Sequence, residues 1–138
     1  MTILAKSSTA SLDKNQARQV AAGNLYAGEN LDPVSACYIK LSDGLVYMSD
    51  GAFNNEAAKF HGFTPQAYKI GEPVTLFGAG SRFKYGSGMT PGTTLYIAAT
   101  DYYSGVLDTA ATTGDTKGVA FAVSATDIVC CRTDPKNG

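Results

Sequence analysis

Short runs of apolar and β-branched residues alternate with turn-forming residues along most of the chain. From Val20 onward, turn signals such as Asp43-Gly44, Asp50-Gly51 and Pro91-Gly92 recur about every eight to twelve residues. The runs between them cover residues 36–41, 45–48, 73–77, 82–85, 94–98, 105–107, 118–123 and 127–132. This spacing predicts an all-β fold, either a β-sandwich or a small barrel of short antiparallel strands.

Two segments depart from this pattern. Residues 54–60, Asn-Asn-Glu-Ala-Ala-Lys-Phe, predict one short helix of about two turns, closed by His61-Gly62. Residues 1–22 are rich in polar residues and lack a wide apolar stripe, so they predict an extended N-terminal arm. We expect this arm either to fray or to become ordered against a partner. The β-rich domain then spans residues 23–138.

A weak internal repeat runs through the predicted strands. Residues 31–39, Leu-Asp-Pro-Val-Ser-Ala-Cys-Tyr-Ile, align with residues 89–97, Met-Thr-Pro-Gly-Thr-Thr-Leu-Tyr-Ile, at an offset of 58 (89 − 31). In both copies a proline fixes a turn before a strand that carries a tyrosine, and a glycine turn and an apolar pair follow. The pattern suggests a duplicated β-unit over about residues 29–77 and 87–131, within one domain.

Charge and composition narrow the function classes. The chain of 138 residues carries 11 Lys and Arg against 12 Asp and Glu, a net charge of −1. A nucleic-acid-binding protein would need an excess of basic residues, and an anionic membrane would need a basic patch, so we expect neither partner. The first ten residues contain no apolar core of a signal peptide. The 3 cysteines, with Cys130 and Cys131 adjacent, are expected to be reduced thiols of a protein made in a cytoplasm.

Residues that could carry chemistry are sparse. His61 is the only histidine, and its place at the end of the predicted helix is typical of a packed or capping residue. The cysteines lack the spacing of zinc ligands, and most of the aspartates lie in turns, where they usually bond their own backbone. The glycine clusters at 78–80 and 86–88 lie between strands rather than before a helix, unlike phosphate-binding loops. We therefore expect no enzyme activity, no catalytic residues, no cofactor and no metal site.

Aromatic residues are the remaining candidates. Tyr85, Tyr102 and Tyr103 could form an exposed platform for sugars or bases. They could equally lie in a protein interface, where tyrosine is enriched.

The order of short motifs over residues 70–131 resembles that in a known class of small proteins. Residues 70–77 read Ile-Gly-Glu-Pro-Val-Thr-Leu-Phe, and residues 86–97 read Gly-Ser-Gly-Met-Thr-Pro-Gly-Thr-Thr-Leu-Tyr-Ile. Gly-Val-Leu-Asp-Thr follows at 105–109, and Gly-Val-Ala-Phe-Ala-Val-Ser-Ala-Thr-Asp-Ile-Val at 118–129. Together with residues 27–33 and 42–47, these motifs resemble small β-rich structural proteins of tailed bacteriophages. The family is that of capsid decoration (cement) proteins and related head-fibre domains, and the resemblance covers about residues 23–131.

The resemblance implies a structural virion protein. Such a protein is made in the host cytoplasm, binds the major capsid protein on the outer capsid surface and stabilises the mature shell. It acts as a homo-oligomer, with a trimer favoured over a dimer. On this interpretation the arm would contact the capsid through Ile3, Leu4 and Leu12. The alternative is a receptor- or carbohydrate-binding fibre module on the virion that uses Tyr85, Tyr102 and Tyr103.

Overall fold

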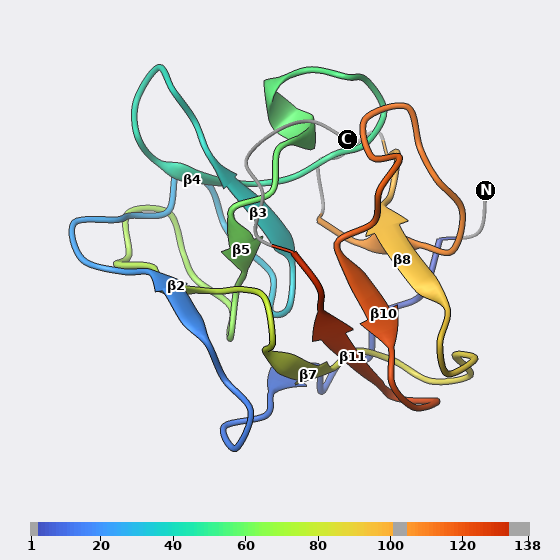
Figure 1. The fold of residues 1–138 in the computed structure, drawn as a ribbon. Coiled ribbons are helices and arrows are strands. Elements are labelled where there is room, and N and C mark those ends of the chain that lie inside the picture. Colours follow the sequence, from blue (N-terminus) through green and yellow to red (C-terminus); the bar gives the residue numbers. More distant parts are fainter. Residues whose placement is uncertain (1–2, 101–104, 133–138) are drawn as a thin grey trace.

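Two antiparallel sheets make up the protein in the computed structural model, which describes residues 3–100 and 105–132 (Figure 1). The first sheet has the order β2-β6-β5-β3-β4, and the second has the order β1-β7-β11-β10-β8-β9. The strands are β1 (Ser11–Leu12), β2 (Gln19–Ala21), β3 (Ala36–Ile39), β4 (Val46–Met48), β5 (Gly62–Phe63), β6 (Leu76–Phe77), β7 (Arg82–Lys84), β8 (Thr94–Ile97), β9 (Leu107–Asp108), β10 (Ala120–Ala122) and β11 (Asp127–Cys130). The all-β, sandwich-like fold expected from the sequence is confirmed, and neither sheet closes into a barrel within the described residues.

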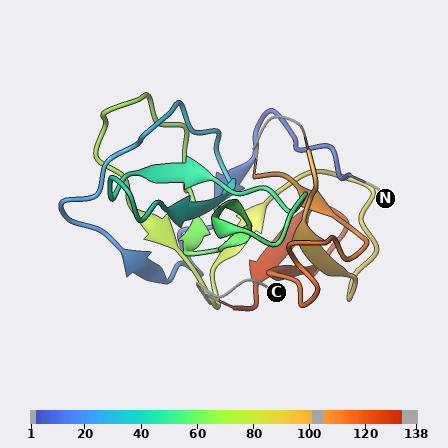
Figure 2. The same ribbon diagram turned by 90° about the horizontal axis from the view of Figure 1, so that it is seen from above.

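The two halves of the chain repeat one topology. Each strand from β2 to β6 has its counterpart five strands later, and the neighbours in the two sheets match throughout. The register matches as well, because Ala36 pairs with Phe63 and Thr94 pairs with Phe121, which is an offset of 58 at both positions. We call residues 19–77 the first half and residues 82–130 the second half. Figure 2 shows the halves side by side, blue to green beside yellow to red.

The central strands of the first sheet are buried on both faces. Cys37 and Leu76 face a core inside the first half, whereas Ala36 and Phe63 face the main core, which the two halves share. The Phe63 and Phe83 ring centroids lie 5.2 Å apart across the two halves. Backbone hydrogen bonds also join them, from the Ala36 N–H to the Gly105 oxygen and from the Gly51 N–H to the Ala98 oxygen. The halves therefore fold as one unit.

The predicted helix is shorter than expected. Only Glu56–Ala58 forms a 3₁₀ turn, η1, in which the Asn55 side chain accepts a hydrogen bond from the Ala57 N–H. The Ala57 oxygen accepts a bond from the Asp50 N–H instead of continuing the helix, and Lys59 is already extended. A segment this short does not recover the cost of helix nucleation, so tertiary bonds decide its conformation.

The N-terminal segment is extended but is paired along its own domain. Ser11 and Leu12 form β1 at the β7 edge of the second sheet. At the opposite edge, Ile3 bridges to Asp108 and the Leu4 N–H donates to the Leu107 oxygen. Residues 3–12 therefore reach both edges of the second sheet, and we call them the N-terminal strap. Figure 2 shows this dark-blue segment beside the second half.

Close packing fixes the strap between its two ends. A Cβ atom at Gly86 would lie 2.6 Å from the Ala5 carbonyl oxygen, so only glycine lets the strap pass there. The Lys6 Nζ donates to the Pro33 oxygen and to the Ser35 hydroxyl, each at 2.7 Å, and thereby ties the strap to the first half. Burial lowers the pKa of Lys6 to about 8.

Candidate functional site

A groove of about 410 Å³ lies beside the β3–β4 hairpin and η1 in the first half. Among the residues that line it are Glu29, Tyr38, Lys40, Tyr47, Asn55 and Glu56. We call it the tyrosine groove. Its volume is within the range of about 300–1,000 Å³ that small-molecule sites occupy.

Two cross-strand tyrosines form one wall of the groove. Tyr38 on β3 lies opposite Tyr47 on β4, with ring centroids 6.0 Å apart and ring planes inclined by 32°. The Tyr47 ring is held in place from several sides. The Lys40 Nζ lies 5.0 Å from the ring centroid, and a Cβ atom at Gly28 would lie 2.4 Å from the Tyr47 Cζ, so a larger residue there would displace the ring.

The tip of the hairpin fixes the far end of the Tyr47 side chain. The Tyr47 hydroxyl donates to Asp43 Oδ2 at 2.7 Å, while Asp43 Oδ1 accepts from the Leu45 N–H at 2.9 Å. The hydrogen bond from Tyr47 lowers the pKa of Asp43 and raises the pKa of Tyr47, because it favours the carboxylate and the neutral phenol.

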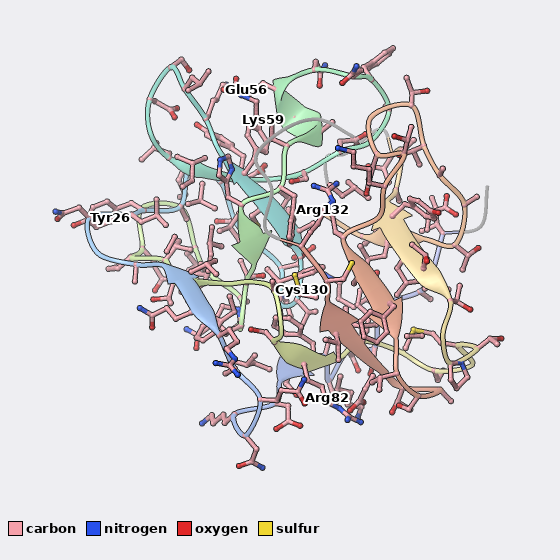
Figure 3. The ribbon with its side chains drawn as sticks, in the orientation of Figure 1. Tyr26, Glu56, Lys59, Arg82, Cys130 and Arg132 are labelled. Atoms are coloured by element: carbon pink, nitrogen blue, oxygen red, sulfur yellow. The ribbon has the colours of Figure 1, made fainter. Side chains whose placement is uncertain are left out.

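Two carboxylates also line the groove, and each is anchored by a backbone N–H. Glu29 Oε2 accepts from Met48 at 2.8 Å, and Glu56 Oε2 accepts from Leu41 at 2.7 Å. Burial raises the pKa of Glu29. In Figure 3, Glu56 lies between η1 and the β3–β4 hairpin. The groove thus holds an ammonium group and two fixed carboxylates around a tyrosine wall.

The histidine and the three cysteines lie in different environments. His61 is half-buried, its Nδ1 accepts the Ile39 N–H at 3.0 Å, and desolvation lowers its pKa. Burial raises the pKa of the Cys37 thiol and that of Cys130, the latter to about 12, whereas Cys131 is exposed. Over residues 3–100 and 105–132, no three His, Cys, Asp or Glu side chains gather as metal ligands would. This part of the chain also contains no helix long and apolar enough to cross a membrane.

A second surface of interest is the outer face of the second sheet. Phe121 on β10 and Val123 just after it are both 37% exposed, and Val129 lies beside Phe121 on β11. The equivalent of Phe121 in the first half is Phe63, which is fully buried between the halves. The face of the first sheet that carries Phe63 is therefore covered within the chain, whereas the equivalent face of the second sheet, which carries Phe121, is open to solvent.

The structure contradicts the expectation for one of the three tyrosines singled out in the sequence. Tyr85 is not an exposed interface residue, because its ring is fully buried in the main core. Its hydroxyl accepts the Leu107 N–H at 2.9 Å and donates to the Leu4 oxygen at 3.4 Å. Tyr102 and Tyr103 lie outside the described residues.

The three arm residues also have different environments. Ile3 is 47% exposed, but Leu4 and Leu12 pack against the main core of their own chain. Sequence reasoning missed Tyr38 and Tyr47 as a pair. The Asp43-Gly44 turn was the available signal, since a hairpin around it sets residues opposite each other on the same face.

No protein-family model matches the chain, and the search of curated proteins finds no match.

Proposed function

We propose that this protein is a structural virion protein that binds the outer surface of a tailed-bacteriophage capsid and stabilises the mature shell. The order of motifs over residues 23–131 supports the virion class, because it resembles decoration and head-fibre proteins. The near-neutral charge and the all-β fold are compatible with a protein that packs on another protein surface.

The outer face of the second sheet is the observation that carries a protein-binding role. Phe121, Val123 and Val129 present apolar surface on adjacent strands. Charged groups, which normally occupy the solvent face of an antiparallel sheet, border this apolar surface: Arg82 pairs in register with Val129, and Asp127 with Lys84. In the first half the same face is used for packing, with Phe63 at its centre. We assign the open copy of this face to the contact with the major capsid protein.

Binding of this kind stabilises a shell by mass action. A protein that binds only the mature lattice lowers the free energy of that lattice and not of its precursors. Many copies on one shell, joined as a trimer or a dimer, multiply a modest contact energy per site. The protein then needs a flat apolar contact rather than a catalytic centre.

Co-sedimentation with mature capsids that lack this protein tests the proposal. The wild type should pellet at a fixed ratio to the capsid protein, whereas a Phe121→Lys/Val123→Lys variant should lose at least about tenfold in affinity, because buried charges would be left unpaired. Leu41→Lys is the matched control, since Leu41 is 81% exposed and lies on the other half of the chain.

Circular dichroism and thermal melting must show that each variant is folded. If the lysine variant does not fold, Phe121→Thr/Val123→Thr keeps the β propensity and removes most of the apolar surface. Wild-type pelleting by a folded variant of either kind would refute this capsid contact. A wild type that ignores capsids would refute the function itself.

A further inference from the structure

We infer that the tyrosine groove is a binding site for a neutral saccharide. The inference concerns the first half of the chain and does not depend on the capsid contact, which is assigned to the second half. It rests on the charges inside the groove, on the way its carboxylates are anchored and on the aromatic wall.

The groove carries charges of both signs. Its two carboxylates, Glu29 and Glu56, disfavour an anion, and the Lys40 ammonium offsets part of their attraction for a cation. A neutral polyol can use both signs of charge, because its hydroxyl groups donate to carboxylates and accept from an ammonium group. Hydrogen bonds that involve a charged partner are the stronger kind, so such a ligand gains from both signs of charge.

The two carboxylates are already oriented for this task. Each binds a backbone N–H through Oε2, and neither Oε1 has a hydrogen-bond partner among the described residues. A ligand hydroxyl that binds Oε1 would therefore displace no bond within the protein. Little side-chain entropy would be lost on binding, because the anchored carboxylates are held before the ligand arrives.

The aromatic wall supplies the apolar part of the contact. Tyr38 lies beside Tyr47 in the wall, but Tyr38 and Met48 are each only 8% exposed. The partly buried Tyr47 ring is therefore the aromatic surface that a ligand would contact. Pyranose rings carry a face of C–H groups that packs against such surfaces, while their hydroxyls point to the rim. The groove thus offers apolar contact and directed hydrogen bonds in one site, as small-molecule sites commonly do.

Titration of the isolated chain by two-dimensional ¹H–¹⁵N NMR tests the site. The probes are D-glucose, D-galactose, N-acetyl-D-glucosamine and L-rhamnose. At least one should shift the amide signals of residues 38, 47 and 56–57 in a saturable way, with a Kd of about 1 mM or below, which is weak binding. L-arginine amide and inorganic phosphate serve as a cationic and an anionic probe.

Glu56→Gln and Lys40→Gln should each weaken saccharide binding at least about fivefold, since each removes one charged hydrogen-bond partner. Matched controls are Glu72→Gln and Lys69→Gln. Glu72 also accepts a backbone N–H, from Lys69, but neither residue lines the groove. These controls should bind the saccharide as the wild type does.

Three results would overturn the inference. They are the absence of groove shifts with every saccharide, unchanged binding by both groove variants, and tighter groove binding of arginine amide or phosphate than of any saccharide. The Phe121→Lys/Val123→Lys variant should keep saccharide binding, so failure of the capsid contact and failure of the groove can be told apart.

Discussion

The Asp115→Ala substitution should remove a large part of the stability of the second half. The Asp115 side chain is fully buried in the loop that leads from β9 to β10. Its two oxygens accept from the N–H groups of Ile97 at 2.8 Å and Gly118 at 2.8 Å, and from the Lys117 N–H at 3.2 Å. This one carboxylate thus joins β8 to the start of the β10 segment.

An ion pair adds to this network. The Arg132 Nη2 donates to Asp115 Oδ1 at 3.1 Å, and the Arg132 Nε donates to the Gly118 oxygen at 2.6 Å. The Arg132 side chain is only 15% exposed, so removal of the carboxylate takes an ion-pair partner away from a largely buried cation. Removing one partner of a buried ion pair lowers the free energy of unfolding by about 3–5 kcal/mol. That is a large fraction of the roughly 5–15 kcal/mol by which a domain is stable.

Urea unfolding followed by circular dichroism measures the effect. A loss of about 4 kcal/mol lowers the midpoint by about 2 M if the m value is near 2 kcal/mol/M. Asp115→Asn should lose less, because it keeps one acceptor oxygen. The control is Asp13→Ala, whose carboxylate is more than a third exposed and lies 4.0 Å from Arg82, so it should lose less than about 1 kcal/mol. If Asp115→Ala costs no more than the control, the network does not stabilise the fold as argued.

Three further predictions concern the N-terminal strap and the cysteines. The pKa of Lys6 in the folded protein, about 8, is below its ordinary value of 10.5, so the unfolded chain binds more protons between these pH values. The stability of the wild type relative to Lys6→Met should therefore rise as the pH increases from about 8 to 10.5 in urea titrations, and a constant or falling difference would contradict this. Deletion of residues 2–12 should lower the melting temperature by more than about 10 °C, because both edges of the second sheet lose their pairing, whereas a free arm would leave it unchanged. Ellman's reagent should titrate one thiol, Cys131, in the folded chain and all 3 in urea, and early reaction of Cys37 or Cys130 would contradict their burial.

Local signals predicted the strands well, because turn residues act over a few positions. The Asp43-Gly44 turn connects β3 and β4, and the runs expected at 36–41 and 94–98 contain β3 and β8. The offset of 58 seen in the sequence recurs in the strand pairing of Ala36 with Phe63 and Thr94 with Phe121. These features depend on backbone conformation and on alternation along one strand.

Burial was harder to predict for the aromatic residues. Tyr85 was a candidate for an exposed platform or interface, and its sequence neighbours Lys84 and Gly86 give no sign of burial. In the fold, the strap covers it and the Leu107 N–H meets its hydroxyl, so it becomes a core residue. Phe63 and Phe121 hold equivalent places in the repeat, yet one is buried and the other is exposed. No pattern within either strand distinguishes them.

The sequence by itself therefore determined the all-β class, the positions of most strands and the repeated unit, because turns and strand alternation are local properties. Only the tertiary structure decided that the N-terminal segment pairs with its own second sheet. It also decided that the repeated sheet face is covered once and open once, and that Tyr38, Tyr47, Glu29 and Glu56 form one groove. These outcomes depend on contacts between residues far apart in the chain. The favoured arrangement is the one that buries the most apolar surface and leaves the fewest buried backbone N–H and C=O groups without a hydrogen bond.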